Sequence, residues 1–153
     1  MTHHLAQLNI ARMKAPLDSP VMADFVANLA RINGLAEASP GYLWRLQDES
    51  GDATALRPFG DDVVVNLSLW RDLDSLKAFT YQGAHTEMLK RRGEWFDRLG
   101  EAHQVLWWVP AGHRPDVYEA ARRLARLREE GTGPEAFTFR HAYPVPAATS
   151  PVA

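Results

Sequence analysis

The chain has 153 residues, of which 46% are hydrophobic and 24% are charged, so it is long enough for one globular domain with its own core. Its net charge of −2 provides no global attraction to nucleic acid or to an anionic membrane. There is no cysteine, which excludes disulfides, thiolate metal sites and a catalytic thiol.

The first part of the chain predicts a strand, a helix and a second strand. Residues 4–13 alternate with period two, as a half-buried strand does. Asp18-Ser19-Pro20 is a typical helix start, and we expect the helix to end at Gly34. Its apolar stripe consists of Val21, Phe25, Leu29 and Ile32. After a Pro-Gly turn, residues 42–47 predict the second strand, and residues 48–62 predict a long hairpin loop.

The middle of the chain repeats this order. Residues 63–70 form the clearest alternating pattern in the sequence and predict a third strand. Asp72 or Asp74 can cap the helix that follows. We expect a break in this helix at Gly83 and its end at Gly100.

The last part predicts one more strand and one more helix. The strand is expected over residues 104–109, and the helix over residues 115–130, closed by Gly131. Residues 137–143 can add a short extended segment, and the Pro- and Ala-rich residues 144–153 predict a flexible tail.

Two strand–helix–strand units in succession predict an α+β, ferredoxin-like split βαβ fold. In this fold an antiparallel sheet carries its helices on one face. The helix after the fourth strand is an extra C-terminal helix, and we expect residues 1–143 to form a single domain. The other face of the sheet must find a partner or stay in contact with water.

Two segments resemble a known superfamily. Residues 67–79, LSLWRDLDSLKAF, resemble the strand–Trp–helix junction of the antibiotic-biosynthesis-monooxygenase-like, dimeric α/β-barrel superfamily. Residues 106–113, LWWVPAGH, together with Trp95-Phe96 and the later Arg- and Leu-rich helix, are similar to an uncharacterised bacterial family within it. The resemblance implies a homodimer in which two sheets close face to face into a barrel.

One face of the predicted strands carries polar side chains among apolar ones. In a split βαβ sheet the first and third strands are neighbours, so Asn9 can lie beside Asn66 or Ser68, with Trp70 nearby. Amides and a hydroxyl among apolar walls are typical of a small-molecule pocket. The alternative is that these groups face a dimer seam or solvent and are satisfied there.

His85 is the sharpest single candidate, because it shares an apolar helical stripe with Met88, Leu89, Phe96 and Leu99. An imidazole in that position can act as a general base or as an axial ligand to iron. The alternative is a histidine satisfied in the core or at its edge.

The resemblance adds roles for these residues. Heme-degrading members of the superfamily use an asparagine on the first strand, a tryptophan ending the third strand and a histidine on the second helix, to which Asn9, Trp70 and His85 correspond. The interval of 15 residues between Trp70 and His85 is longer than in those enzymes. Cofactor-independent members instead oxidise electron-rich aromatic substrates. The residues expected to bind and orient such a substrate are Asn66, Ser68, Arg45, Tyr81 and Trp95.

Other features favour plainer interpretations. The arginines between residues 114 and 128 alternate with acids, which is typical of a solvated helix face rather than of a nucleic-acid site. The remaining histidines have no metal-binding spacing, so no metal is expected unless His85 binds heme. The N-terminus does not resemble a signal peptide and no apolar run is long enough to span a membrane, so we expect a cytoplasmic protein.

The leading hypothesis is a small-molecule enzyme, a cofactor-independent monooxygenase or a cyclase or isomerase, that acts on an apolar aromatic metabolite. Its catalytic residues are expected to be His85, Asn9 and Trp70. A heme-binding protein with His85 as the axial ligand and a non-catalytic ligand-binding dimer are the alternatives.

Overall fold

The computed structural model describes residues 2–47, 59–81 and 85–146, except for the side chain of His85. The elements in chain order are β1 (His3–Met13), the 3-10 helix η1 (Pro20–Met22), α1 (Ala23–Glu37), β2 (Tyr42–Arg45), β3 (Val63–Trp70), α2 (Leu73–Tyr81), α3 (His85–Lys90), α4 (Arg92–Trp95), β4 (Phe96–Asp97), β5 (Gln104–Pro110) and α5 (Val117–Glu130).

The sheet confirms the predicted ferredoxin-like, split βαβ arrangement. β3 and β5 both pair antiparallel with the central strand β1, and β2 extends the sheet on the far side of β3. The short strand β4 pairs with the last two residues of β1. In this register Gln7 lies opposite Ser68, and Asn9 lies opposite Asn66 on one side and Gln104 on the other.

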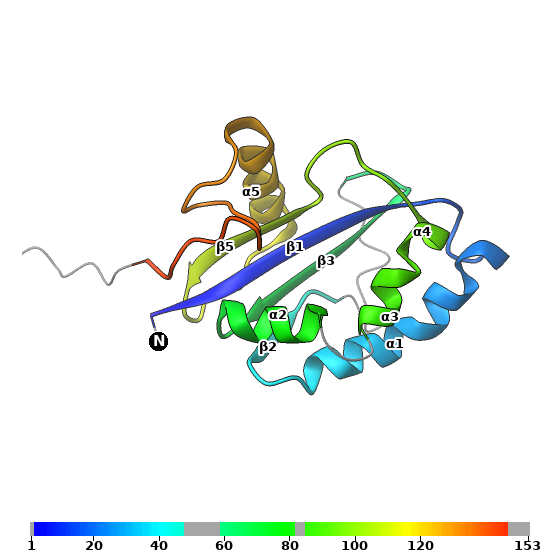
Figure 1. The fold of residues 1–153 in the computed structure, drawn as a ribbon, viewed down its shortest axis with the longest axis horizontal. Helices are drawn as coiled ribbons and strands as arrows, with labels where there is room; N and C mark the ends of the chain where they lie inside the picture. Colours follow the sequence, from blue (N-terminus) through cyan, green and yellow to red (C-terminus); the bar gives the residue numbers. More distant parts are fainter. Residues whose placement is uncertain (1, 48–58, 82–84, 147–153) are drawn as a thin grey trace, which may run out of the picture.

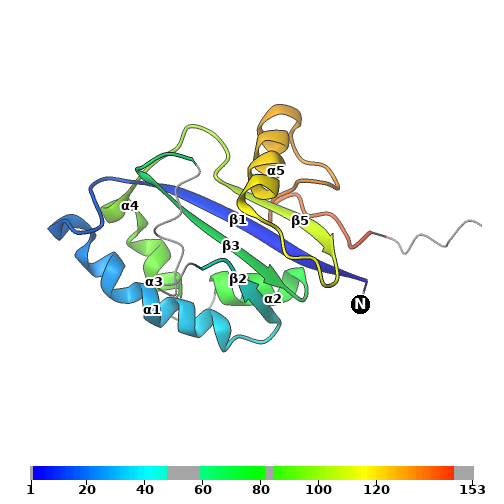
Figure 2. The same ribbon diagram turned by 180° about the vertical axis from the view of Figure 1, so that it is seen from behind.

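The helices occupy two layers (Figures 1 and 2). Helices α1 to α4 lie on one face of the sheet, as the split βαβ pattern predicts. The extra helix α5 packs on the opposite face, where its Leu124 and Leu127 share a buried cluster with Leu8 and Trp107. The face on which the C-terminal helix packs had no signal in the sequence. The homodimer that the resemblance implies stays a prediction.

Helix α1 differs from its predicted bounds. It does not end at Gly34 but runs on to Glu37, and Gly34 does not adopt the positive φ of a glycine that ends a helix. The first turn of the predicted helix is instead the 3-10 helix η1, which presents a different side chain to the core. Val21 is 51% exposed and Met22 is fully buried, so methionine takes the core position expected for valine.

The second helical region ends earlier than expected, and it is divided at Arg91 into α3 and α4. α2 ends at Tyr81 and α3 begins at His85, while Gly83 itself lies outside the described residues. The helix does not continue to Gly100 but ends at Trp95, because Phe96 and Asp97 pair with β1 instead. The predicted second strand likewise ends at Arg45 rather than at residue 47.

The caps explain why α2 and α5 begin where they do. The Asp72 carboxylate accepts a hydrogen bond of 2.8 Å from the Ser75 backbone N–H, and Asp116 accepts one of the same length from that of Glu119. Gly131, at φ +75°, ends α5 as predicted.

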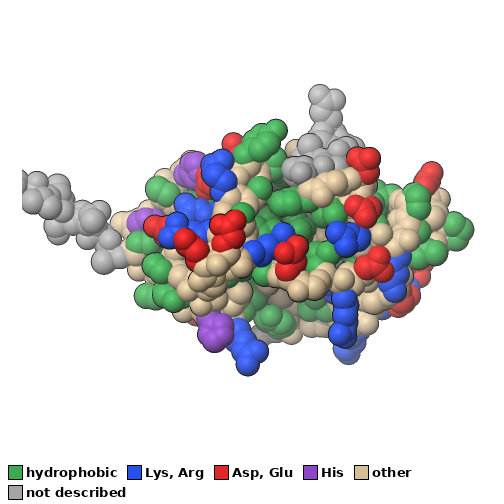
Figure 3. Space-filling model, turned by 90° about the horizontal axis from the view of Figure 1, so that it is seen from above, with side chains coloured by type: hydrophobic (Ala, Val, Ile, Leu, Met, Phe, Trp, Pro, Cys, Tyr) green, Lys and Arg blue, Asp and Glu red, His purple; other side chains and the backbone are tan. Residues whose placement is uncertain are grey.

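The exposed side of α5 has mixed charge, as predicted for a solvated helix face. Arg126 pairs with Glu130 at 3.2 Å and with Glu135 at 2.7 Å, and Arg128 pairs with Glu101 at 3.3 Å. Figure 3, which shows the molecule from the α5 side, has Lys and Arg side chains interspersed with Asp and Glu. Within the described ranges, no helix is long and apolar enough to cross a lipid bilayer.

Candidate active site

The sheet face covered by α1 to α4 is apolar at both ends and polar in the middle. One apolar cluster includes Leu5, Trp70 and Leu106, and the other includes Met13 and Trp95. Between them the strands present Gln7, Asn9, Asn66, Ser68 and Gln104. Amides cannot be packed under apolar helices without partners, and a cavity of about 370 Å³ lies over this polar band. The cavity also has walls of apolar side chains, among them Phe25, Leu29, Phe79 and Met88.

The polar band is a connected network of hydrogen bonds. The buried Gln7 side chain donates from Nε2 to the Ser68 hydroxyl oxygen over 3.1 Å and to Asn66 Oδ1. Trp70 Nε1 donates to the same Ser68 oxygen over 2.9 Å. Gln104 Nε2 donates to Gln7 Oε1 over 3.4 Å. Ser68 therefore accepts two hydrogen bonds, which leaves its own hydrogen for an acceptor in the cavity.

Asn9 stands out beside this network. Its Oδ1 atom is buried, and no donor among the described residues lies within hydrogen-bond distance of it. Leaving a buried acceptor unpaired costs about 1–3 kcal/mol. Asn9 is also one of the residues that line the cavity, so this unpaired oxygen belongs to the cavity wall.

The cavity has cationic side chains as well. Arg45, on β2, forms an ion pair of 2.9 Å with Glu37. Arg92, the first residue of α4, is half-buried, and burial lowers the pKa of its guanidinium. No acidic side chain in the described part of the chain forms an ion pair with Arg92.

His103 lies directly before β5, near enough to Arg92 for the charge of that arginine to act on its ring. Its backbone carbonyl accepts a hydrogen bond of 2.9 Å from the N–H of Ile10, which fixes the residue beside β1. Burial lowers the pKa of the His103 imidazole below its ordinary value of 6.5, and the positive charges of Arg92 and Arg128 lower it further. The ring is therefore neutral near pH 7 and able to accept a proton.

We expect His103 to make the stability of the protein sensitive to mild acid. Because its pKa is lower in the folded state than in the unfolded state, the unfolded state binds the proton first as the pH falls below 6.5. The free energy of unfolding, measured with urea at about pH 7.5 and about pH 5.5, should therefore fall less in His103→Gln than in the wild type. His141→Gln, at an exposed histidine, is the control and should match the wild type. An equal loss of stability in His103→Gln and the wild type would contradict this prediction.

The predicted site residues meet in this cavity wherever the structure describes their side chains. These are Asn9, Arg45, Asn66, Ser68, Trp70, Tyr81 and Trp95. Tyr81 is 55% exposed, at the end of α2, whereas Trp95 is almost completely buried. His85 is the first residue of α3, and its side chain lies outside the described part of the structure, so its role stays a prediction.

Sequence reasoning did not select Arg92, His103 and Gln104, which also line the cavity. Gln104 could have been found from the strand order, since it pairs with Asn9 across β1 and β5. For Arg92 the signal was an arginine one helical turn after Met88, on an otherwise apolar stripe. His103 lies outside the regular strand and had no comparable signal.

Comparisons with known proteins place this geometry in a wider context. A family model described as a domain of unknown function (DUF3291) matches residues 4–152, in agreement with the predicted resemblance to an uncharacterised family. No curated protein matches the sequence significantly.

Several solved structures are similar to this chain at low sequence identity. A protein of unknown function from Nitrosomonas europaea is 15% identical over 75% of this chain and 95% of its own, with a TM-score of 0.47. A mutant of SnoaB, a cofactor-independent oxygenase from Streptomyces nogalater, is 14% identical over 74% of this chain and 98% of its own, with a TM-score of 0.46. A heme-degrading protein from Mycobacterium tuberculosis is 14% identical over 76% of this chain and 99% of its own, with a TM-score of 0.41. Likeness at this level carries no inference about chemistry.

Proposed function

The chain belongs to the family described as a domain of unknown function (DUF3291), and we propose that it is a small-molecule enzyme acting on an aromatic metabolite in the cavity between the sheet and α1 to α4. Monooxygenation without a cofactor and rearrangement of the substrate are the two reactions that we consider.

The observation that carries this proposal is the unsatisfied polar band inside the cavity. Asn9 Oδ1 lacks a donor and the hydrogen of the buried Ser68 hydroxyl lacks an acceptor among the described residues. The Asn66 side chain is exposed, so its N–H groups are available to a bound molecule as well as to water. A packed core pairs its buried polar groups, so unpaired groups around a hollow support a bound molecule. That molecule would carry a donor facing Asn9 and an oxygen facing Asn66 and Ser68.

This arrangement suits a reaction that begins with the loss of a proton. Removing a proton from an electron-rich aromatic substrate leaves negative charge on an oxygen, and donors already oriented toward that oxygen stabilise it. Asn66 and Ser68 are the proposed donors, and Asn9 orients the substrate. Trp70 forms an apolar wall and holds Ser68 in place through its N–H group. His85 is the proposed general base.

We expect His85→Ala to reduce turnover by about 10²- to 10⁴-fold, which is the range for loss of a general base. Oxygen uptake with a panel of dihydroxynaphthalenes tests monooxygenation, and absorbance changes under nitrogen test rearrangement. The turnover of His103→Ala is measured in parallel, because His103 lines the cavity within the described part of the chain. His141→Ala, at an exposed histidine, is the control. Full activity in His85→Ala with loss in His103→Ala would transfer the role of base to His103.

Heme is the alternative cofactor, and the residues around the cavity are compatible with it. His103 offers an imidazole, and the half-buried Arg92 offers a partner for a propionate. Titration with hemin distinguishes the two proposals. A Soret band that His85→Ala or His103→Ala removes would favour heme binding over cofactor-independent chemistry.

Ligand binding with neither heme uptake nor turnover would favour a non-catalytic binding protein.

A further inference from the structure

The charge of the cavity wall is one-sided. Two arginines, Arg45 and Arg92, line it, and none of the lining residues that the structure describes is an aspartate or a glutamate. The two arginines differ in their surroundings, because Arg45 is neutralised by Glu37 at 2.9 Å. Arg92 therefore provides the uncompensated positive charge.

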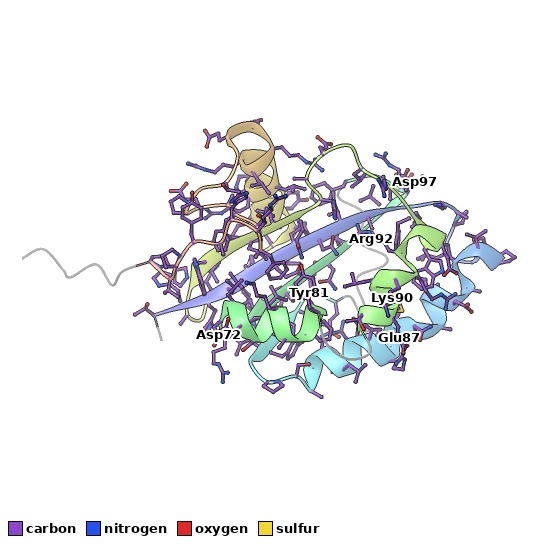
Figure 4. All side chains as sticks on the ribbon, viewed as in Figure 1. Asp72, Tyr81, Glu87, Lys90, Arg92 and Asp97 are labelled. Atoms are coloured by element: carbon purple, nitrogen blue, oxygen red, sulfur yellow. The ribbon has the colours of Figure 1, made fainter. Side chains whose placement is uncertain are left out.

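Two acidic side chains of this region form ion pairs with a different arginine. Arg91 pairs with Asp24 at 2.6 Å and with Glu94 at 2.8 Å. Figure 4 labels Arg92, Glu87 and Lys90, and of these three residues Arg92 lines the cavity whereas the other two do not. Arg92 is thus the arginine of this region that faces the cavity and is left without a carboxylate among the described residues.

A half-buried guanidinium without a counter-ion is costly, and arginine cannot avoid the cost by losing its proton. A bound anion would compensate it. A carboxylate is the best match, because its two oxygens accept the parallel hydrogen bonds of a guanidinium and its single negative charge balances one arginine.

The opposite end of the cavity is aromatic. Arg92 and His103 lie toward the Asn9 end of β1, where His103 is bonded to Ile10. Trp70 lies opposite Leu5, at the other end of β1, and its ring stacks on Phe79 with their centroids 5.3 Å apart. A flat aromatic ring packs well against such a wall.

We propose that the substrate is an aromatic acid, whose carboxylate pairs with Arg92 while its ring packs toward Trp70 and Phe79. This inference rests on the proposed function, since it assigns a substrate class to the same cavity.

The experiment compares two ligands of the same shape that differ in charge. Binding of 2-naphthoate and of 2-naphthamide is measured by calorimetry on the wild type, Arg92→Met, Arg92→Lys and Arg98→Met. In the wild type we expect naphthoate to bind roughly 10- to 100-fold more tightly than the amide, as for a charge-assisted hydrogen-bonded pair. Arg92→Met should lose this preference and still bind the amide, and Arg92→Lys should keep part of it.

Arg98→Met is the matched control. It removes one positive charge from an exposed residue near β4 that does not line the cavity, so it should keep the preference for naphthoate. The proposed carboxylate pairing is overturned if the wild type binds both ligands equally, or if a folded Arg92→Met keeps an unchanged preference for naphthoate. Either result would still be consistent with an aromatic pocket. Binding of neither ligand by the wild type overturns the aromatic pocket as well.

Discussion

Trp70→Ala is expected to lower the free energy of unfolding by about 3–5 kcal/mol, the range for removing a large aromatic side chain from a core. Trp70 is 1% exposed, stacks on Phe79 and meets Tyr42 edge to face with centroids 5.7 Å apart. The substitution empties the space between β3 and α2 and removes one of the two donors to Ser68. Urea denaturation measures the loss.

Trp70→Phe separates packing from hydrogen bonding. It keeps an aromatic ring against Phe79 but removes the N–H that holds Ser68, so we expect a smaller loss, on the order of 1–2 kcal/mol. If Trp70→Ala and Trp70→Phe were equally unstable, the hydrogen bond to Ser68 rather than the packed ring would account for the stability. A loss below about 1 kcal/mol in Trp70→Ala would contradict the description of Trp70 as a core residue.

Gly41→Ala is expected to be the second strongly destabilising substitution. Gly41 has φ +84°, and an added Cβ would meet the Cβ of Ser75 at 2.4 Å and also overlap its hydroxyl oxygen. The backbone strain costs roughly 1–3 kcal/mol, and crowding a buried side chain costs a similar amount. Ser75 cannot move away easily, because it is buried in the first turn of α2, where Asp72 caps its backbone N–H.

The matched control is the same substitution at Gly34. This glycine lies in the interior of α1, and an added Cβ would meet nothing within 4 Å. We expect Gly34→Ala to raise the free energy of unfolding by roughly 0.5–1 kcal/mol, because alanine favours the helix. Thermal unfolding of both variants tests the opposite signs. A neutral Gly41→Ala would show that the turn before β2 can rearrange.

The pattern of polar and apolar residues along single strands was sufficient to predict much of the site. Strict alternation placed Asn66, Ser68 and Trp70 on one side of a strand. The two strand–helix–strand units then placed Asn9 on the neighbouring strand, and the register confirms this adjacency. Prediction succeeded here because a two-residue period is a local property of the chain, and antiparallel pairing brings matching faces together.

Local pattern failed where two side chains distant in sequence had to be placed together. Nothing in the sequence indicated that Arg92 of α4 and His103 before β5 would share one end of a cavity, since that depends on how α4 packs against the sheet. The extension of α1 beyond Gly34 shows a related failure, because an isolated glycine ends a helix only where the fold requires a turn.

The sequence by itself therefore determined the α+β class, the strand order and the polar face of the sheet, all of which follow from periodicity and chain connectivity. Only the tertiary structure decided that α5 covers the opposite face and that no described residue donates to the buried Asn9 Oδ1 atom. It also decided that the positive charge of Arg92 lies in the same hollow. Burial and pairing are properties of side chains brought together by packing, and a one-dimensional pattern does not contain those distances.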